Sequence, residues 1–230
     1  MIRENLKAIQ KTIGAIAERL GRNAQDITLV GVTKYADAQK LQEAVEAGLT
    51  HIGENRVQDA LEKFPALMNS YPQVKRHFIG HLQTNKVKDA LKLFDVIQSV
   101  DSFHLARSLE KHAAAQNRSV DILIQVNTSG EKQKFGVYPA QCRPLINQMK
   151  ACPHLPILGL MTIAPLTEDK DRIRQTFRDL RLLKDQVQKD WPSGSRVQMK
   201  YLSMGMSHDF EIALEEGSNM VRIGSAIFKN

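Results

Sequence analysis

The sequence predicts a TIM-like (β/α)8 barrel that occupies residues 1–230 as a single domain, with an extra helix before its first strand. Eight short apolar, β-branched runs alternate with amphipathic stretches, as is typical of parallel strands covered by helices. A length of 230 residues fits one barrel, since these domains often run to roughly 200–250 residues undivided. An open Rossmann-type sheet is disfavoured because residues 31–35 (GVTKY) are not the Gly-rich fingerprint that would follow its first strand.

The strand candidates take their order from the chain. Several read as continuous apolar runs, which indicates strands buried on both faces. The eight runs cover residues 27–33, 50–53, 76–80, 96–100, 121–126, 157–163, 197–202 and 220–223.

The helix candidates show apolar residues at helical spacing, with Asp37 as a predicted N-cap for the helix after the first strand. The expected core-facing sets are Leu6, Ile9, Ile13, Ile16 and Leu20; Leu41, Ala44, Val45 and Gly48; Val57, Ala60, Leu61 and Phe64; and Ile173, Phe177, Leu180 and Val187.

Composition and charge narrow the class of function. Hydrophobic residues make up 42% of the chain and charged residues 25%, a globular balance. The net charge of +7 comes from basic residues interleaved with acids, which favours an anionic small ligand over nucleic acid as the main partner. Cys142 and Cys152 form no CxxC or Cys/His cluster, so we expect buried or incidental thiols and no metal site.

The termini and apolar runs give no targeting signal. The first residues do not form a signal peptide, because an acidic residue comes early and no apolar core follows. The longest apolar stretch, 157–166, is well short of the roughly 20 residues that span a bilayer. We therefore expect a cytoplasmic protein that makes no membrane contact.

Lys34 stands at the end of the first strand candidate. Counted by twos, Val30, Val32 and Lys34 share one face, so the lysine is expected to point into the barrel mouth if the valines point inward. Partial desolvation there would favour the neutral amine that attacks an aldehyde. The alternative is a solvated lysine that has just left a strand.

Two further segments follow the last two strand candidates, where barrel active sites and phosphate sites lie. After residue 202, Ser207 is a predicted N-cap for a helix that begins near Asp209, and a helix start exposes N–H groups to a phosphate. At the end of the eighth run, Arg222 and Gly224 share a face, and a buried arginine there calls for an anionic or acceptor partner. The alternatives are an ordinary loop and a salt bridge that closes the barrel.

Closure of the barrel would bring these three segments together. A phosphate cradle, an arginine and an apolar-lined lysine outline a site for pyridoxal 5′-phosphate (PLP). A phosphosugar site would share the cradle but would add carboxylates for proton transfer, and Glu54 is the one inward acid that we nominate.

At these residues the sequence resembles the YggS/PROSC family of pyridoxal phosphate homeostasis proteins over essentially its whole length. The 77–86 stretch is the most specific match, while Arg76 replaces an expected aromatic residue and Lys229 an expected glycine. The matching stretches are 32–34 (VTK), 53–55 (GEN), 77–86 (HFIGHLQTNK), 159–161 (GLM), 202–207 (LSMGMS) and 222–225 (RIGS).

The resemblance implies a fold like the N-terminal barrel of alanine racemase, the fold-type III architecture of PLP-binding proteins. It implies a Schiff base on Lys34 and an arginine, Arg222, that faces the pyridine nitrogen and weakens the ring as an electron sink. The remaining implied contacts are Asn55 and Met161 beside the ring and Ser203, Ser207, Gly224 and Ser225 at the phosphate.

The resulting hypothesis is a PLP-binding protein of intracellular vitamin B6 homeostasis or cofactor carriage, monomeric, with PLP as its ligand, PLP-dependent apoenzymes as candidate recipients and no catalytic residue. We expect no second domain of the kind that completes a racemase. The alternatives are an amino-acid racemase-like PLP enzyme, which amino-acid turnover would reveal, and a phosphate-binding isomerase without PLP. The candidate second bases for racemisation are Glu54, His77, His81 and His208.

Overall fold

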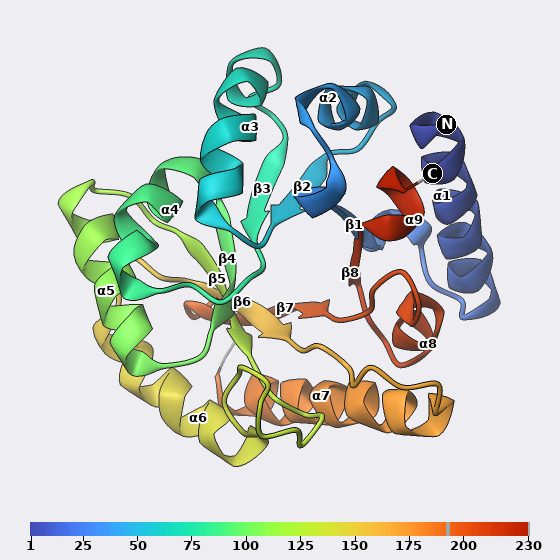
Figure 1. Cartoon of the computed structure of the whole chain (residues 1–230). Coiled ribbons are helices and arrows are strands. Elements are labelled where there is room, and N and C mark those ends of the chain that lie inside the picture. Colours follow the sequence, from blue (N-terminus) through green and yellow to red (C-terminus); the bar gives the residue numbers. More distant parts are fainter. Residues whose placement is uncertain (192–193, 230) are drawn as a thin grey trace.

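The computed structural model describes residues 1–191 and 194–229, and its eight strands close into one barrel in chain order, β1 to β8 (Figure 1). Every neighbouring pair is parallel, including β8 with β1. The barrel that the alternating pattern predicts is therefore confirmed. The strands are β1 Thr28–Val32, β2 His51–Glu54, β3 Lys75–Phe78, β4 Val96–Val100, β5 Asp121–Gln125, β6 Ile157–Met161, β7 Val197–Ser203 and β8 Met220–Ile223.

Helices surround the strands on the outside of the barrel (Figure 1). The predicted N-cap of α2 is confirmed, since the Asp37 carboxylate accepts the Lys40 N–H at 2.8 Å. The helices are α1 Ile2–Arg19, α2 Ala38–Glu46, α3 Val57–Ser70, α4 Val87–Leu93, α5 Phe103–Ala115, α6 Pro139–Gln148, α7 Lys170–Asp190, α8 Phe210–Glu215 and α9 Ser225–Phe228, with 3₁₀ turns at Ala24–Asp26, Thr33–Tyr35, Thr84–Lys86 and Met149–Ala151.

The apolar residues form two clusters on opposite sides of the strands. The larger fills the space between strands and helices and contains Ile122 and Ile124 of β5, whereas Leu123 between them belongs to a small cluster with Val30, Met161 and Met220. Because successive residues of a strand face opposite ways, the small cluster lies inside the barrel.

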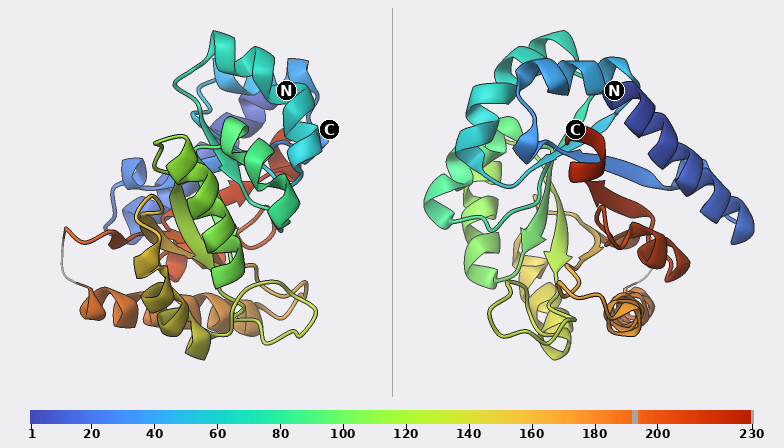
Figure 2. Two further views of the ribbon diagram at one scale, coloured as in Figure 1. Left: turned by 90° about the vertical axis from the view of Figure 1, so that its left-hand side faces the viewer. Right: turned by 45° about the vertical axis from the view of Figure 1, so that its right-hand side comes forward.

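The extra helix α1 lies along the outside of the barrel beside α8 and α9, so the two ends of the chain come close together (Figure 2). The Asn5 amide donates to the Ile227 carbonyl at 3.0 Å, and the Arg19 guanidinium contacts Glu215 at 2.6 Å. These contacts fix α9, and with it the end of β8, against the N-terminal helix.

Most predicted core positions are confirmed, with two corrections. Leu61 is 44% exposed and Leu20 38% exposed, because Leu61 lies on the outer face of α3 and Leu20 follows the last turn of α1. Cys142 and Cys152 are buried free thiols, as expected. No helix within the described ranges combines the length and apolar character needed to cross a bilayer.

Candidate functional site at the barrel mouth

Arg222 lies near the end of β8 and is 3% exposed. Its guanidinium donates from Nη1 to Ser203 Oγ at 2.7 Å and from Nη2 to the Thr162 carbonyl at 2.8 Å. Both acceptors are neutral, and no carboxylate of the described residues forms an ion pair with this side chain. Burial lowers the pKa of Arg222 to about 10, and the charge of Asp209 partly offsets that effect. The group therefore stays cationic at neutral pH without a paired anion.

Ser203 ends β7 and is completely buried. Its Oγ accepts from Arg222 and donates to Gln98 Oε1 at 2.6 Å. The structure therefore differs from the expectation of a phosphate contact here, because the hydroxyl already bridges two side chains inside the barrel.

The loop between β7 and α8 carries the predicted phosphate cradle, but its helix begins differently from the prediction. The N-cap of α8 is Asp209, not Ser207, and the Asp209 carboxylate accepts the Met206 N–H at 2.5 Å. Ser207 Oγ instead accepts the Ala226 N–H at 3.4 Å. The half-buried hydroxyl thus joins the loop after β7 to the first turn of α9.

Gly224 and Ser225 connect β8 to α9. A Cβ at Gly224 would lie 3.1 Å from the Val32 backbone oxygen, so a side chain here would crowd the place where β8 closes on β1. Ser225 is the first residue of α9 and is half-buried. Because Val30 of β1 pairs with Arg222 of β8, this connection lies beside the segment that carries Lys34.

Lys34 is exposed, which corrects the expectation of a desolvated lysine. The strand ends at Val32, and the chain turns into the 3₁₀ segment Thr33–Tyr35, so the alternation that would aim Lys34 with the valines stops. The Lys34 amine lies 4.7 Å from the centre of the Tyr35 ring, and the Lys229 amine lies 4.5 Å from it. These two cations lower the pKa of the Tyr35 hydroxyl, chiefly through a hydrogen bond with Lys34.

Glu54, the nominated inward acid, is completely buried and fully engaged. It accepts from Thr33 Oγ1 at 2.8 Å, from the Asn55 N–H at 2.8 Å and from Lys63 Nζ at 3.3 Å. Asn55 is exposed at the end of β2, and Met161 is buried in the small cluster inside the barrel. Glu54 therefore ties β1, β2 and α3 together and is not placed as a free proton acceptor.

The three candidate histidines have separate environments. His77 is buried and hydrogen-bonded to His51 and Gln98, both at 2.9 Å. The ring of His81 stacks on Phe135 with centroids 3.9 Å apart, and His208 is exposed. The sequence reasoning missed His51 and Gln98, although polar residues at buried positions of successive strands were a signal that could have revealed them.

The two departures from the family pattern are accommodated away from the barrel interior. Arg76 pairs with Asp95 through Nε at 2.8 Å and Nη2 at 2.7 Å, so a charge pair at the start of β3 stands where an aromatic residue was expected. Lys229 contributes the second amine over Tyr35 at the barrel rim.

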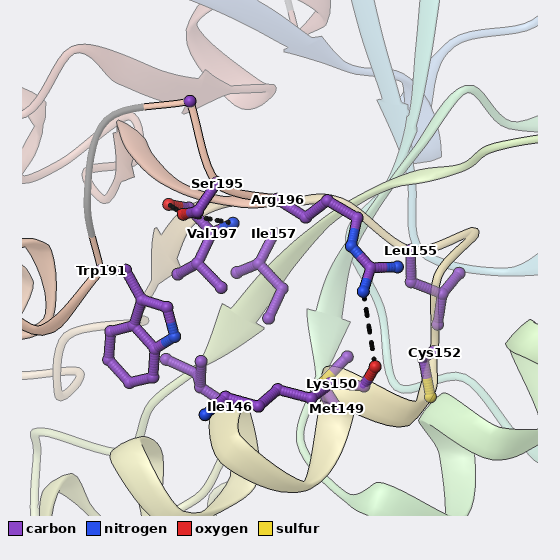
Figure 3. Close-up of a pocket in the computed structure, with 11 residues that line it drawn as sticks. Ile146, Met149, Lys150, Cys152, Leu155, Ile157, Trp191, Ser195, Arg196 and Val197 are labelled. Atoms are coloured by element: carbon purple, nitrogen blue, oxygen red, sulfur yellow. Dashed lines mark hydrogen bonds between the residues drawn. The ribbon is translucent and has the colours of Figure 1, made fainter.

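A cavity of about 430 Å³ lies away from all predicted site residues, between α6, the end of α7 and the starts of β6 and β7 (Figure 3). Its lining includes Ile157, Val197 and Trp191, and the Arg196 guanidinium is held by the Lys150 carbonyl at 3.4 Å. The parallel strands run from this end toward Arg222, so the cavity lies at the opposite end of the barrel. In the part of the chain that the structure describes, no cluster of His, Cys, Asp or Glu is suited to hold a metal ion.

Comparisons with known proteins agree with this architecture. The family model described as alanine racemase, N-terminal domain, matches residues 4–230. A pyridoxal phosphate homeostasis protein of Aquifex aeolicus is 40% identical over 225 residues, covering 98% of this chain and 96% of the relative.

Solved structures extend the likeness. PipY of Synechococcus elongatus, determined with PLP bound, superposes with a TM-score of 0.84 at 33% identity over 99% of this chain and 100% of its own. An alanine racemase of Clostridium difficile shares the fold, with a TM-score of 0.78 at 14% identity over all of this chain and 56% of its own. The chain therefore belongs to the alanine racemase N-terminal domain family and, within it, to the pyridoxal phosphate homeostasis proteins.

Proposed function

We propose that this protein binds PLP at the mouth formed by the ends of β7, β8 and β1, and serves intracellular PLP homeostasis or carriage. The observation that carries the proposal is the buried guanidinium of Arg222, which has only neutral acceptors. A buried cation without a paired anion is costly unless a ligand or a polar group uses it. Relatives named for PLP homeostasis and a PLP-bound structure at 33% identity support the same ligand.

Arg222 suits the pyridine nitrogen of the cofactor. Two of its five N–H donors serve Ser203 and Thr162, which leaves donors for a ligand acceptor. A cation at this position opposes protonation of the ring nitrogen, and the cofactor then supplies a weaker electron sink than a pyridinium would. That property suits binding and release better than turnover.

The loops after β7 and β8 suit the phosphate. Ser207 Oγ and the turn at Gly224 and Ser225 lie at the starts of two short helices, where N–H groups and hydroxyls can donate to phosphate oxygens. Because Ser203 Oγ is buried against Arg222, we assign it to holding the guanidinium and not to the phosphate itself.

Lys34 is the residue proposed to hold PLP covalently. Its primary amine adds to the cofactor aldehyde, and loss of one water leaves the Schiff base. The exposed amine is accessible for that step, provided that it leaves the face of Tyr35. Asn55 and Met161 are proposed as neighbours of the ring, from the ends of β2 and β6.

The absence of turnover is also a proposal. Racemisation needs an acid or base on each face of the substrate carbon. Glu54 and His77 are occupied by internal hydrogen bonds, and His81 is stacked on Phe135. We further propose a cytoplasmic monomer, folded as one domain, that passes PLP to apoenzymes. Inversion of an amino acid by purified protein, lost in Lys34→Ala, would contradict the carrier proposal.

Borohydride reduction of the PLP-loaded protein, followed by peptide mass mapping, tests the site. The pyridoxyl label is expected on Lys34, with visible cofactor absorbance lost in Lys34→Ala. Lys229→Ala is the matched control, because it removes the other amine over Tyr35 and should keep the label in place. Label found mainly on Lys229, Lys86, Lys134 or Lys200 would contradict the assignment.

A further inference from the structure

A continuous chain of side-chain hydrogen bonds crosses the barrel interior and ends at Arg222. The five members come from β2, β3, β4, β7 and β8, and the four links measure 2.9, 2.9, 2.6 and 2.7 Å. In order they are His51, His77, Gln98, Ser203 and Arg222. All except His51 are buried, so bulk water is not available to replace a broken link.

The direction of each hydrogen bond follows from Arg222, because a guanidinium can only donate. Ser203 Oγ therefore accepts from Arg222, and its own proton goes to Gln98 Oε1. The carbonyl oxygen of Gln98 is thereby assigned, and its Nε2 group must donate to His77.

The assignment continues through the two histidines. His77 accepts at Nδ1 and so carries its proton on Nε2, from which it donates to Nδ1 of His51. The second N–H of Gln98 points at the Met220 sulfur at 3.2 Å. Every polar atom of the Gln98 amide is thus used in this orientation, and rotating the amide by 180° would oppose donors at both of its strong links.

The chain does not conduct protons to the site, because arginine keeps its proton in proteins. What it can transmit is orientation. Without an acceptor at Gln98 Oε1, the Ser203 hydroxyl would be free to rotate, and its lone pairs would no longer be held toward Arg222 Nη1. The guanidinium would then keep one fixed anchor, the Thr162 carbonyl.

We propose that Gln98 is a positioning residue of the cofactor site, which orients Ser203 so that Arg222 is held ready for the ligand ring. This inference rests on the proposed function for its ligand-binding half. Its other half, the order of hydrogen bonds, is a property of the protein without cofactor. Gln98 itself lies on β4 and acts only through Ser203 and Arg222.

Two substitutions at position 98 separate positioning from bulk packing. Gln98→Met keeps the length of the side chain and removes both strong hydrogen bonds. Gln98→Glu keeps the acceptor for Ser203 and removes the donor to His77. Ser99→Ala is the matched control, because the buried Ser99 Oγ has no hydrogen-bond partner among the described residues and lies next to Gln98 on the strand.

The first measurement uses the cofactor-free protein, with the His77 ring nitrogens observed by ¹⁵N NMR. We expect the proton on Nε2 in the wild-type protein and on Nδ1 in Gln98→Glu, where a carboxylate replaces the amide donor. A proton on Nδ1 in the wild-type protein would overturn the assigned order of bonds, even if Gln98→Met fails to fold.

The second measurement compares the affinities of PLP and pyridoxal. Gln98→Met should weaken both about tenfold, the equivalent of one hydrogen bond, because Arg222 serves the ring that both ligands share. Gln98→Glu and Ser99→Ala should stay within about threefold of the wild-type protein. Unchanged affinities in Gln98→Met, or weakening confined to PLP, would overturn the positioning role. Failure of the wild-type protein to bind PLP would overturn the proposed function, while the His77 measurement would still test the chain.

Discussion

Arg222 and Lys34 belong to neighbouring strands of the barrel but are held in opposite ways. Arg222 is 3% exposed, and its guanidinium has two fixed acceptors. Lys34 is exposed, and its amine has only the side chain of Tyr35 as a neighbour. The interior half of the site is therefore set before any ligand arrives, whereas the rim half must rearrange to meet it. A rigid group can select the ligand and a mobile one can capture and release it.

The sharpest test of this comparison exchanges the two kinds of effect. Lys34→Met should abolish covalent retention of PLP and change the free energy of unfolding of the cofactor-free protein by no more than about 0.5 kcal/mol. Arg222→Lys should retain the covalent label but lower that free energy by about 1–3 kcal/mol, because lysine cannot reach both acceptors with a planar fork. Urea unfolding and label mapping measure the two effects.

The comparison would fail if both variants destabilised the cofactor-free protein equally. Lys229→Met controls for removal of a surface cation near Tyr35. It should preserve both the label and the unfolding midpoint.

The sequence predicted the barrel because buried parallel strands leave a simple pattern of apolar runs. It also placed Lys34, Ser207 and Arg222 in one sector, since the chain order of a barrel makes the last strands neighbours of the first. The detailed environment of Lys34 did not follow, because the strand ends at Val32 and the next residues form a 3₁₀ turn. Alternation by twos holds only while the chain remains extended.

The polar chain inside the barrel was harder to predict. Gln98 and Ser203 are separated by 105 residues in the sequence, and each alone reads as a polar interruption of an apolar strand. The N-cap at Asp209 was missed for a local reason: Ser207 and Asp209 are both good capping residues, and the backbone selects Asp209. Ser207 is thereby left to contact α9.

Ser207 offers a second, smaller test, of the rim alone. If its hydroxyl donates to the phosphate, Ser207→Ala should weaken PLP binding tenfold to a hundredfold, or roughly 1.5–3 kcal/mol, without weakening pyridoxal. Ser207→Thr keeps the hydroxyl and should restore most of the affinity. Equal weakening of both ligands by Ser207→Ala would indicate that the residue only supports the loop.

The interior half of the site should also respond to acid through His51, at the far end of the chain from Arg222. Burial lowers the pKa of His51 to about 4, and the charges of Lys75 and Lys200 act in the same direction. In the unfolded chain the histidine titrates near 6.5. Between these values the unfolded state binds more protons than the folded one, so the free energy of unfolding falls as the pH drops from about 6.5 to about 4.

His51→Asn isolates this contribution. Asparagine offers an oxygen where Nδ1 of His51 accepts from His77, but it does not titrate. Stability at pH 7 should stay within about 0.5 kcal/mol of the wild-type value, and the acid-induced loss should shrink by about 1–2 kcal/mol, less than the full pKa shift implies because the ring is partly exposed to solvent. Urea unfolding at a series of pH values measures both. Parallel pH profiles for the two proteins would show that His51 is protonated equally in the folded and unfolded states, and that the chain ends at His77.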